Sequence, residues 1–124
     1  MLSKITSFKD LEIWQEAHGL VLEIYRITKS FPVEEIYGLT SQIRRSAVSV
    51  AACIVEGHSR NTTKEFIKFL FDARGSCAET KYHLLLSKDL GYISFEEFEN
   101  LNNRYEILGK RINSLINSLE KNSN

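Results

Sequence analysis

Helix-breaking residues are scarce in this chain, and their positions divide it into long uninterrupted stretches. The 124 residues contain one proline and six glycines, whereas an all-β sandwich uses many such residues in its turns. The breakers that separate the stretches are Pro32, Gly38, Gly57 and Gly91. The stretches between them are long enough for helices of several turns. This spacing therefore predicts an all-α fold with four long helices.

The ends of these helices carry capping signals. Asp10 is the expected N-cap of the first helix. Thr62 and Ser94 each begin a capping box, with a glutamate three residues later, and Gly91 is the expected left-handed residue after the third helix. We predict helices over residues 10–30, 39–58, 62–89 and 94–119 of a single domain that spans residues 1–124. Short connections between helices of similar length favour antiparallel neighbours, so we expect an up-down-up-down antiparallel four-helix bundle.

The first and third helices carry more apolar surface than one bundle can bury. The first has two neighbouring heptad stripes, which begin at Leu11 and Ile13. The third also has two, which begin at Phe66 and Ile67. Because an exposed apolar strip on a monomer marks an interface, we predict a homo-oligomer; the alternative is that neighbouring helices cover the wide stripes. The predicted interface residues are Ile13, Leu20, Ile24, Ile27, Ile67, Phe71, Tyr82 and Leu85.

Small residues on the second and third helices predict a close approach of these two helices. If the chain folds back about Asn61, Ala47 lies level with Gly75, and Ser46 lies level with Ser76. A glycine inside a helix costs about 1 kcal/mol relative to alanine unless packing requires it. We therefore interpret Gly75 as part of a tight contact between the two helices.

Glu79 enters two interpretations. The same register places it near Arg44 and Arg45, which predicts an arginine–glutamate ion pair between the second and third helices. Glu79 and His83 are also four residues apart on one helix face, so the pair is the one candidate for a metal ligand set, although supporting carboxylates are missing.

Motifs of known catalytic chemistry are missing from the sequence. There is no Gly-rich phosphate loop, no Cys-x-x-Cys pair and no nucleophile elbow. No histidine stands three residues after a glutamate, as di-iron bundles require. We therefore expect a protein that is not an enzyme and that binds no cofactor and no metal.

Two further observations favour a cytoplasmic protein. The longest near-continuous apolar run, residues 47–55, is too short to span a bilayer, and the first residues show no secretory signal. Cys53 and Cys77 are then interpreted as small core residues and not as a disulfide.

Charge gives a mixed indication about nucleic acid. The formal net charge is zero, with 16 basic and 16 acidic side chains, which argues against a protein that coats nucleic acid by charge alone. Residues 39–90 nevertheless hold eight basic and five acidic side chains. Arg60, Lys64 and Lys68 cluster around the expected turn between the second and third helices, a candidate phosphate contact. The alternative is an ordinary solvated helix end.

Six stretches of the chain carry a family resemblance. They are FKDLEIWQ at residues 8–15, YGLTSQIRRSAVS at 37–49, IVEG at 54–57, EFxxFL at 65–70, ARGSCAE at 73–79 and KDLGYI at 88–93. In this order they resemble the bacterial four helix bundle protein family, named for members encoded in intervening sequences of 23S ribosomal RNA genes. The family includes the accessory variability determinant of diversity-generating retroelements. The resemblance covers residues 8–118, and it departs from the family at residues 51–53, where Pro-Ala-Asn is common.

The resemblance implies a barrel-like homopentamer of four-helix bundles without known catalytic activity. For the retroelement branch it implies binding of nucleic acid and of a reverse transcriptase through a basic surface. The residues expected to contact RNA or DNA are Arg44, Arg45, Arg60, Lys64, Lys68 and Arg74. We therefore expect a ring-like, non-enzymatic scaffold or adaptor that associates with nucleic acid. The alternatives are a structural or protein-binding ring without nucleic acid and, less favoured, a metal- or small-ligand-binding bundle.

Overall fold

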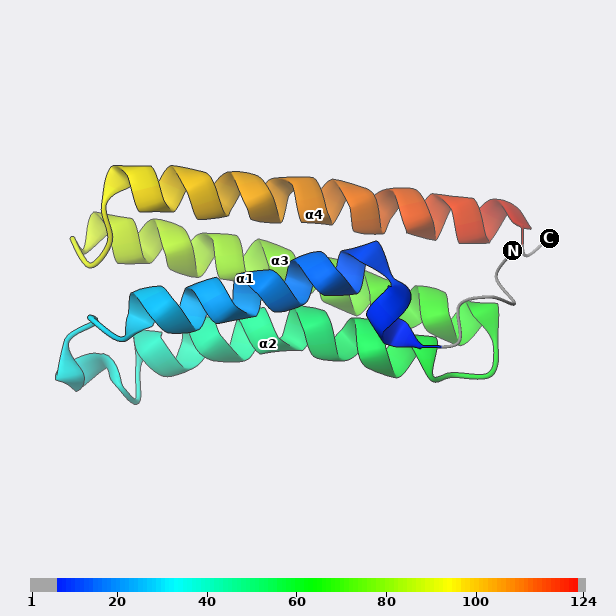
Figure 1. Cartoon of the computed structure of the whole chain (residues 1–124), viewed down its shortest axis with the longest axis horizontal. Coiled ribbons are helices and arrows are strands. Elements are labelled where there is room, and N and C mark those ends of the chain that lie inside the picture. The colour runs from blue at the N-terminus through cyan, green and yellow to red at the C-terminus, as the bar shows by residue number, and fades with distance from the viewer. Residues whose placement is uncertain (1–6, 123–124) are drawn as a thin grey trace.

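Four long helices lie side by side in the computed structural model, which describes residues 7–122 (Figure 1). The helices are α1 (Glu12–Thr28), α2 (Leu39–His58), α3 (Thr63–Asp89) and α4 (Phe95–Asn122), and two short 3₁₀ helices are η2 (Phe8–Asp10) and η3 (Val33–Glu35). The described residues contain no β-strand. The α1–α2 linker and the α3–α4 turn lie at one end of the molecule, and the α2–α3 connection lies at the other. The predicted all-α, four-helix architecture is confirmed.

Three of the four predicted capping features are present. The Thr62 hydroxyl accepts a hydrogen bond from the Glu65 N–H at 3.1 Å, and the Ser94 hydroxyl accepts one from the Glu97 N–H at 3.0 Å. Gly91 has a φ of 81°, which favours glycine. The N–H of Tyr92 donates to the carbonyl of Ser87 at 2.9 Å, as a Schellman C-cap requires.

The predicted N-cap Asp10 is wrong. Asp10 ends η2, and the extended residue Leu11 stands at the N-cap position of α1 without a side-chain hydrogen bond. The side chain of Ser7 caps η2 instead, by accepting from the N–H of Lys9 at 3.1 Å. Asp10 is therefore part of the short 3₁₀ helix that precedes α1 and does not cap α1.

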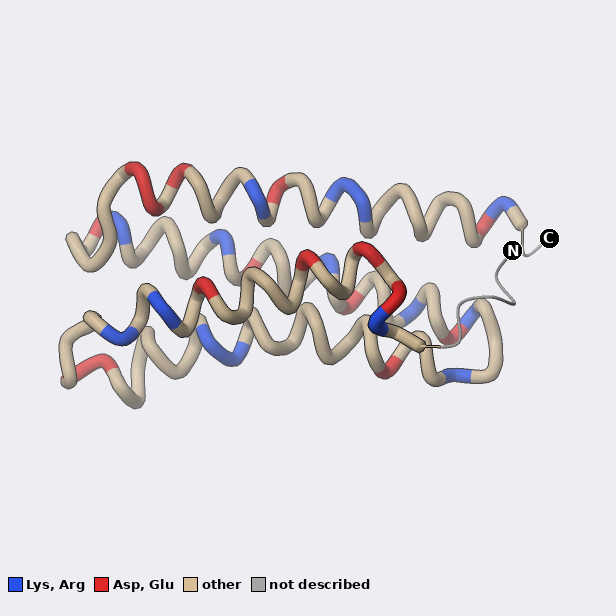
Figure 2. Tube along the Cα trace, in the orientation of Figure 1, with Lys and Arg blue, Asp and Glu red and all other residues tan. Residues whose placement is uncertain are grey.

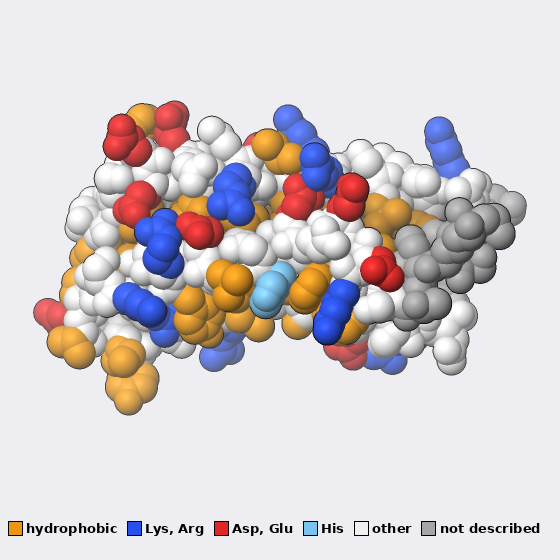
Figure 3. Space-filling model, viewed as in Figure 1, with side chains coloured by type: hydrophobic (Ala, Val, Ile, Leu, Met, Phe, Trp, Pro, Cys, Tyr) orange, Lys and Arg blue, Asp and Glu red, His pale blue; other side chains and the backbone are white. Residues whose placement is uncertain are grey.

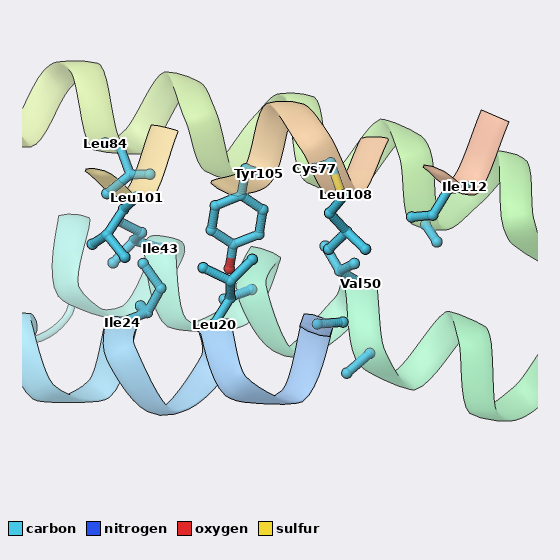
Figure 4. Close-up of a cluster of buried hydrophobic side chains, with 14 of the residues drawn as sticks. Leu20, Ile24, Ile43, Val50, Cys77, Leu84, Leu101, Tyr105, Leu108 and Ile112 are labelled. Atoms are coloured by element: carbon cyan, nitrogen blue, oxygen red, sulfur yellow. The ribbon is translucent and has the colours of Figure 1, made fainter. Parts of the chain in front are cut away.

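One apolar stripe from each helix fills the centre of the molecule. Figure 4 shows Tyr105 and Leu108 of α4 facing Leu20 of α1 and Val50 of α2. The α4 stripe is fully buried over most of its length, as the apolar face of an amphipathic helix in a bundle is. Its buried members are Leu101, Tyr105, Leu108, Ile112, Ile116 and Leu119.

Half of the predicted oligomer interface belongs to this core instead. Ile13, Leu20, Ile24 and Ile27 are at most 7% exposed, so no second copy reaches them. The first helix does carry two stripes, but this one faces inward, and the prediction is wrong for these four residues. The neighbouring stripe, which contains Tyr25, is the one that faces solvent.

The contact between α2 and α3 is partly polar. Thr80 Oγ1 lies 2.8 Å from Ser46 Oγ, and Ser76 Oγ donates to Ser49 Oγ at 2.9 Å. The predicted level of Ser46 with Ser76 is therefore wrong by about one helical turn. The connection itself, residues 59–62, is centred where the prediction placed it, so the shift arises from how α2 and α3 pack along their lengths.

The close approach of α2 and α3 occurs at a different glycine from the one predicted. A Cβ atom on Gly75 would have no neighbour within 4 Å, so Gly75 takes no part in the helix contact. A Cβ on Gly57 would lie 2.8 Å from Phe69 Cβ and 2.9 Å from Phe66 Cδ1. Gly57 therefore allows the last turn of α2 to pack against the first turns of α3.

Candidate functional site

The outer face of α3 exposes large apolar side chains along the length of the helix. Phe71 is 40% exposed, Tyr82 58% and Leu85 39%. The small residues Gly75 and Ala78 continue the same stripe at helical spacing. Because the opposite stripe of α3 already fills the core, these side chains have no helix of their own chain to cover them. We call this stripe the α3 outer face; it is formed by Phe71, Gly75, Ala78, Tyr82 and Leu85.

A second apolar surface lies between α1 and α2. It is a groove of about 460 Å³ whose apolar walls are Tyr25, Ile36 and Val48. All three side chains are between 39% and 52% exposed. Figure 3 shows hydrophobic side chains gathered along this face of the molecule. The α1–α2 groove, as we call it, is completed by Thr40, Ser41, Arg44 and Arg45.

Arg44 is held in place within the α1–α2 groove. Its Nε donates to Thr28 Oγ1 at 2.8 Å, and its guanidinium carbon lies 4.4 Å from the centre of the Tyr25 ring. Thr28 Oγ1 in turn donates to the carbonyl of Ile24 at 2.7 Å. The predicted ion pair of Arg44 or Arg45 with Glu79 is wrong, because no such pair forms among residues 7–122 and Arg44 turns toward α1 instead.

The residues expected to contact nucleic acid do not form one surface. Figure 2 shows the basic residues spread along the bundle. Arg44 and Arg45 line the α1–α2 groove, whereas Arg60, Lys64 and Lys68 lie at or near the α2–α3 connection. Arg74 lies in a third place, on α3, where its side chain reaches Asn113 of α4.

Arg60 and Arg74, like Arg44, are already engaged inside the chain. Arg60 Nη2 lies 2.7 Å from Glu56 Oε2, and its guanidinium stacks over the Phe69 ring at 4.8 Å. Arg74 donates to Asn113 at 2.5 Å and stacks over the Phe71 ring at 4.8 Å.

The two lysines near the α2–α3 connection are free. Lys64 and Lys68 are exposed and have no ion-pair partner within the described part of the chain. With Ile67 and Phe71 they line a shallow groove of about 450 Å³.

Glu79 and His83 do come together. His83 Nε2 lies 3.5 Å from Glu79 Oε2, and the His83 side chain is 12% exposed. Between residues 7 and 122, no group of three or more His, Cys, Asp or Glu side chains is arranged to hold a metal ion. The pair therefore supplies two ligands at most.

The cysteines are not activated nucleophiles. Burial raises the pKa of the Cys77 thiol to about 12, and burial also raises the pKa of the Cys53 thiol. A thiol with a raised pKa stays protonated at neutral pH and is a poor nucleophile.

The sequence predicted an interface on α1 but assigned it to the stripe of Ile13 and Leu20, which is buried. The exposed stripe of α1 is the neighbouring one, and its Tyr25 lines the α1–α2 groove. Its signal was present, since the stripe through Leu11, Trp14, Val21 and Tyr25 is visible in the sequence. Ile36 and Val48 come from the linker and from α2, and only the packing of α1 on α2 brings them to this stripe.

None of the helices within residues 7–122 is both long and apolar enough to cross a membrane. Among curated proteins, none matches the chain. A similar solved structure is that of a protein of unknown function from the S23 ribosomal protein family of Bacteroides thetaiotaomicron. The two are 27% identical with a TM-score of 0.78, and the match covers 84% of this chain and 97% of the other. The model of the 23S rRNA-intervening sequence protein family matches residues 9–114. The chain therefore belongs to the 23S rRNA-intervening sequence protein family.

Proposed function

We propose that this protein is a non-enzymatic scaffold whose up-down-up-down bundles associate side by side into a homo-oligomeric ring. The observation that carries the proposal is the α3 outer face, where Phe71, Tyr82 and Leu85 remain exposed after the bundle has formed. Burial of such side chains contributes roughly 1–3 kcal/mol each. A stripe of three is therefore a strong drive for association.

The α1–α2 groove is the surface that we propose to receive the α3 outer face of the next copy. It is a groove that combines the apolar walls of Tyr25, Ile36 and Val48 with the cations of Arg44 and Arg45. The α3 outer face is flanked by charges of both signs, Asp72 and Glu79 as well as Lys68 and Arg74, so the proposed match rests on the apolar side chains of the two surfaces. Because the two surfaces differ, the contact is heterologous, and repeating it closes a ring when the rotation permits. A pentamer is the ring that the resemblance implies.

The oligomer is tested by light scattering at micromolar concentration. We expect the wild type to have the mass of several chains and the double variant Tyr82→Glu/Leu85→Glu to be a monomer with unchanged helical content. Ile107→Glu is the matched control, because Ile107 on α4 is 49% exposed and lies outside both surfaces. A monomeric wild type contradicts the proposal, and so does loss of the oligomer in the control.

A second candidate function is association of the ring with nucleic acid. Lys64 and Lys68 support it, because their charges are not compensated by neighbouring carboxylates in ion pairs. A ring repeats this weak site once per subunit, and multivalent contact raises the overall affinity. A reverse transcriptase, as in the retroelement branch, is the protein partner that we propose for such an adaptor.

Salt dependence distinguishes the two candidates. If the ring is an adaptor, RNA or DNA binding weakens with increasing salt. The variant Lys64→Glu/Lys68→Glu then reduces both the affinity and the slope of log affinity against log salt concentration. Lys29→Glu, on the linker side, is the control. Absence of binding at low salt favours a structural or protein-binding ring. A stoichiometric metal in the purified protein that is lost in His83→Ala would favour the metal-binding alternative instead.

A further inference from the structure

The end of the molecule that holds the α1–α2 linker and the α3–α4 turn exposes apolar side chains from both loops. On the linker, Val33 is 79% exposed and Tyr37 is 94% exposed. On the other loop, Leu90 is 48% exposed and Phe95 is 60% exposed. Figure 1 places both loops at the same end. We call these four side chains the loop end.

The loop end has a fixed backbone. Three hydrogen bonds between residues three apart hold the linker: Glu35 N–H to Pro32 at 2.9 Å, Ile36 N–H to Val33 at 3.2 Å, and Gly38 N–H to Glu35 at 2.9 Å. The exposure of Val33 and Tyr37 is therefore a property of an ordered turn.

Glu35 joins the two loops. One carboxylate oxygen accepts from the N–H of Leu39 at 3.0 Å, and the other accepts from the hydroxyl of Tyr92 at 2.9 Å. The Tyr92 ring also lies 5.3 Å from the Phe31 ring. The linker and the turn are thus held side by side, and a partner meets both at once without first ordering them.

The charge around the loop end is strongly acidic. The linker (residues 29–38) and the turn with the start of α4 (residues 88–99) contain six acidic and two basic side chains, and Figure 2 shows the acidic positions at this end. Asp89 pairs with Lys88 at 3.4 Å, and Glu97 pairs with Arg26 at 3.5 Å. Glu35 makes no ion pair but accepts the two hydrogen bonds described above. The carboxylates of Glu34, Glu96 and Glu99 have neither an ion pair nor such a hydrogen bond within residues 7–122.

We propose that the loop end docks a basic amphipathic helix of a partner protein. Apolar side chains of that helix pack on Tyr37 and Phe95, and its lysines or arginines meet the free carboxylates. The sign of the charge argues against a nucleic acid or an anionic membrane at this site, because both carry the same charge as the rim. The surface is distinct from the α3 outer face and the α1–α2 groove, so the proposal goes beyond the ring.

A labelled amphipathic helical peptide made of leucine and lysine is the probe, and a leucine–glutamate peptide of the same pattern is its control. We expect fluorescence anisotropy to show binding of the lysine peptide only, weakened by salt. Tyr37→Ser and Phe95→Ser, one from each loop, are each expected to reduce the affinity about tenfold or more. Glu34→Gln/Glu96→Gln/Glu99→Gln is expected to reduce it further and to lower the salt dependence.

Matched variants away from the loop end decide the result. Ile107→Ser on α4 and Glu12→Gln at the start of α1 should bind the peptide as the wild type does. Equal binding of the two peptides, no binding of either, or an equal loss in these controls overturns the proposal. A change of oligomer mass in Tyr37→Ser also overturns it, because a second copy would then occupy the loop end. The monomeric variant Tyr82→Glu/Leu85→Glu should still bind, which separates this result from the fate of the ring.

Discussion

Helices α3 and α4 are similar in length, with 27 and 28 residues, yet their outer surfaces differ. Each sends one stripe of side chains into the core. Beyond that stripe, α4 carries mostly Asn, Glu, Lys, Arg and Ser, whereas α3 carries Phe71, Tyr82 and Leu85. Apart from Phe95 at its first turn and Ile107, the large apolar side chains of α4 are used within the monomer. The apolar content of α3 exceeds what the monomer buries, which is why we propose α3 as the helix that meets a partner outside its own chain.

The strongest way to break this comparison uses two neighbours on α3. Leu84 is fully buried and Leu85 is 39% exposed. We expect Leu84→Ala to lower the free energy of unfolding of the monomer by roughly 2–5 kcal/mol, because it leaves a cavity in the core. Leu85→Ala should change the same quantity by less than about 0.5 kcal/mol. Both changes are made in a chain that carries Tyr82→Glu, so that the α3 outer face does not associate. Urea unfolding at one protein concentration then measures the two changes in the free energy of unfolding. Equal effects would mean that the outer face is part of the monomer core.

Two glycines give the next largest contrast. Gly57→Ala should destabilise the protein by roughly 1–3 kcal/mol, because the new methyl group meets Phe69 Cβ at 2.8 Å. Gly75→Ala on the α3 outer face should stabilise the helix by about 1 kcal/mol, because nothing lies within 4 Å of the added atom. Thermal unfolding of the monomeric background checks the signs. Destabilisation by Gly75→Ala would restore the predicted tight contact at that residue.

The core stripe of α4 contains one buried polar atom, the hydroxyl oxygen of Tyr105. Tyr105 is fully buried, and its hydroxyl has no hydrogen-bond partner among the described residues. Burial raises the pKa of this phenol, so it stays neutral. Tyr105→Phe should therefore leave the protein equally stable or stabilise it by about 1 kcal/mol, as chemical denaturation would show. A clear loss of stability would reveal that the hydroxyl has a role.

The smallest expected effect lies at Glu35 of the α1–α2 linker, whose carboxylate holds the linker beside the α3–α4 turn. Hydrogen bonds from the Leu39 N–H and the Tyr92 hydroxyl lower the pKa of Glu35 below its usual 4.5. Because the folded value is the lower one, Glu35 contributes stability above the unfolded value, and this contribution is lost as the pH falls through the folded value. The free energy of unfolding of the wild type should therefore exceed that of Glu35→Gln at neutral pH, and this difference should shrink as the pH falls below about 4.5. Glu34→Gln, which changes a carboxylate without such contacts, should show a smaller pH dependence in the same unfolding series.

Prediction from the sequence succeeded where a local signal sufficed. Helix boundaries near Thr62, Ser94 and Gly91 depend on hydrogen bonds within a few residues, and the structure confirms them. Asp10 was misplaced because a 3₁₀ turn, which has almost no sequence signal, precedes α1. The exposed side chains of α3 were predicted, since only one of two stripes can face the core, but the same reasoning chose the wrong stripe on α1.

By itself, the sequence determined that this protein is a set of four long helices with surplus apolar surface, because breakers, caps and heptad spacing act within single helices. The tertiary structure alone decided the register of α2 against α3, and it placed the contact glycine at residue 57 instead of 75. It also turned Arg44 toward Thr28 and brought the linker beside the α3–α4 turn through Glu35. These features depend on how far one helix slides and rotates against another. That displacement is set by the packing of all four helices together, and no single stretch of the sequence encodes it.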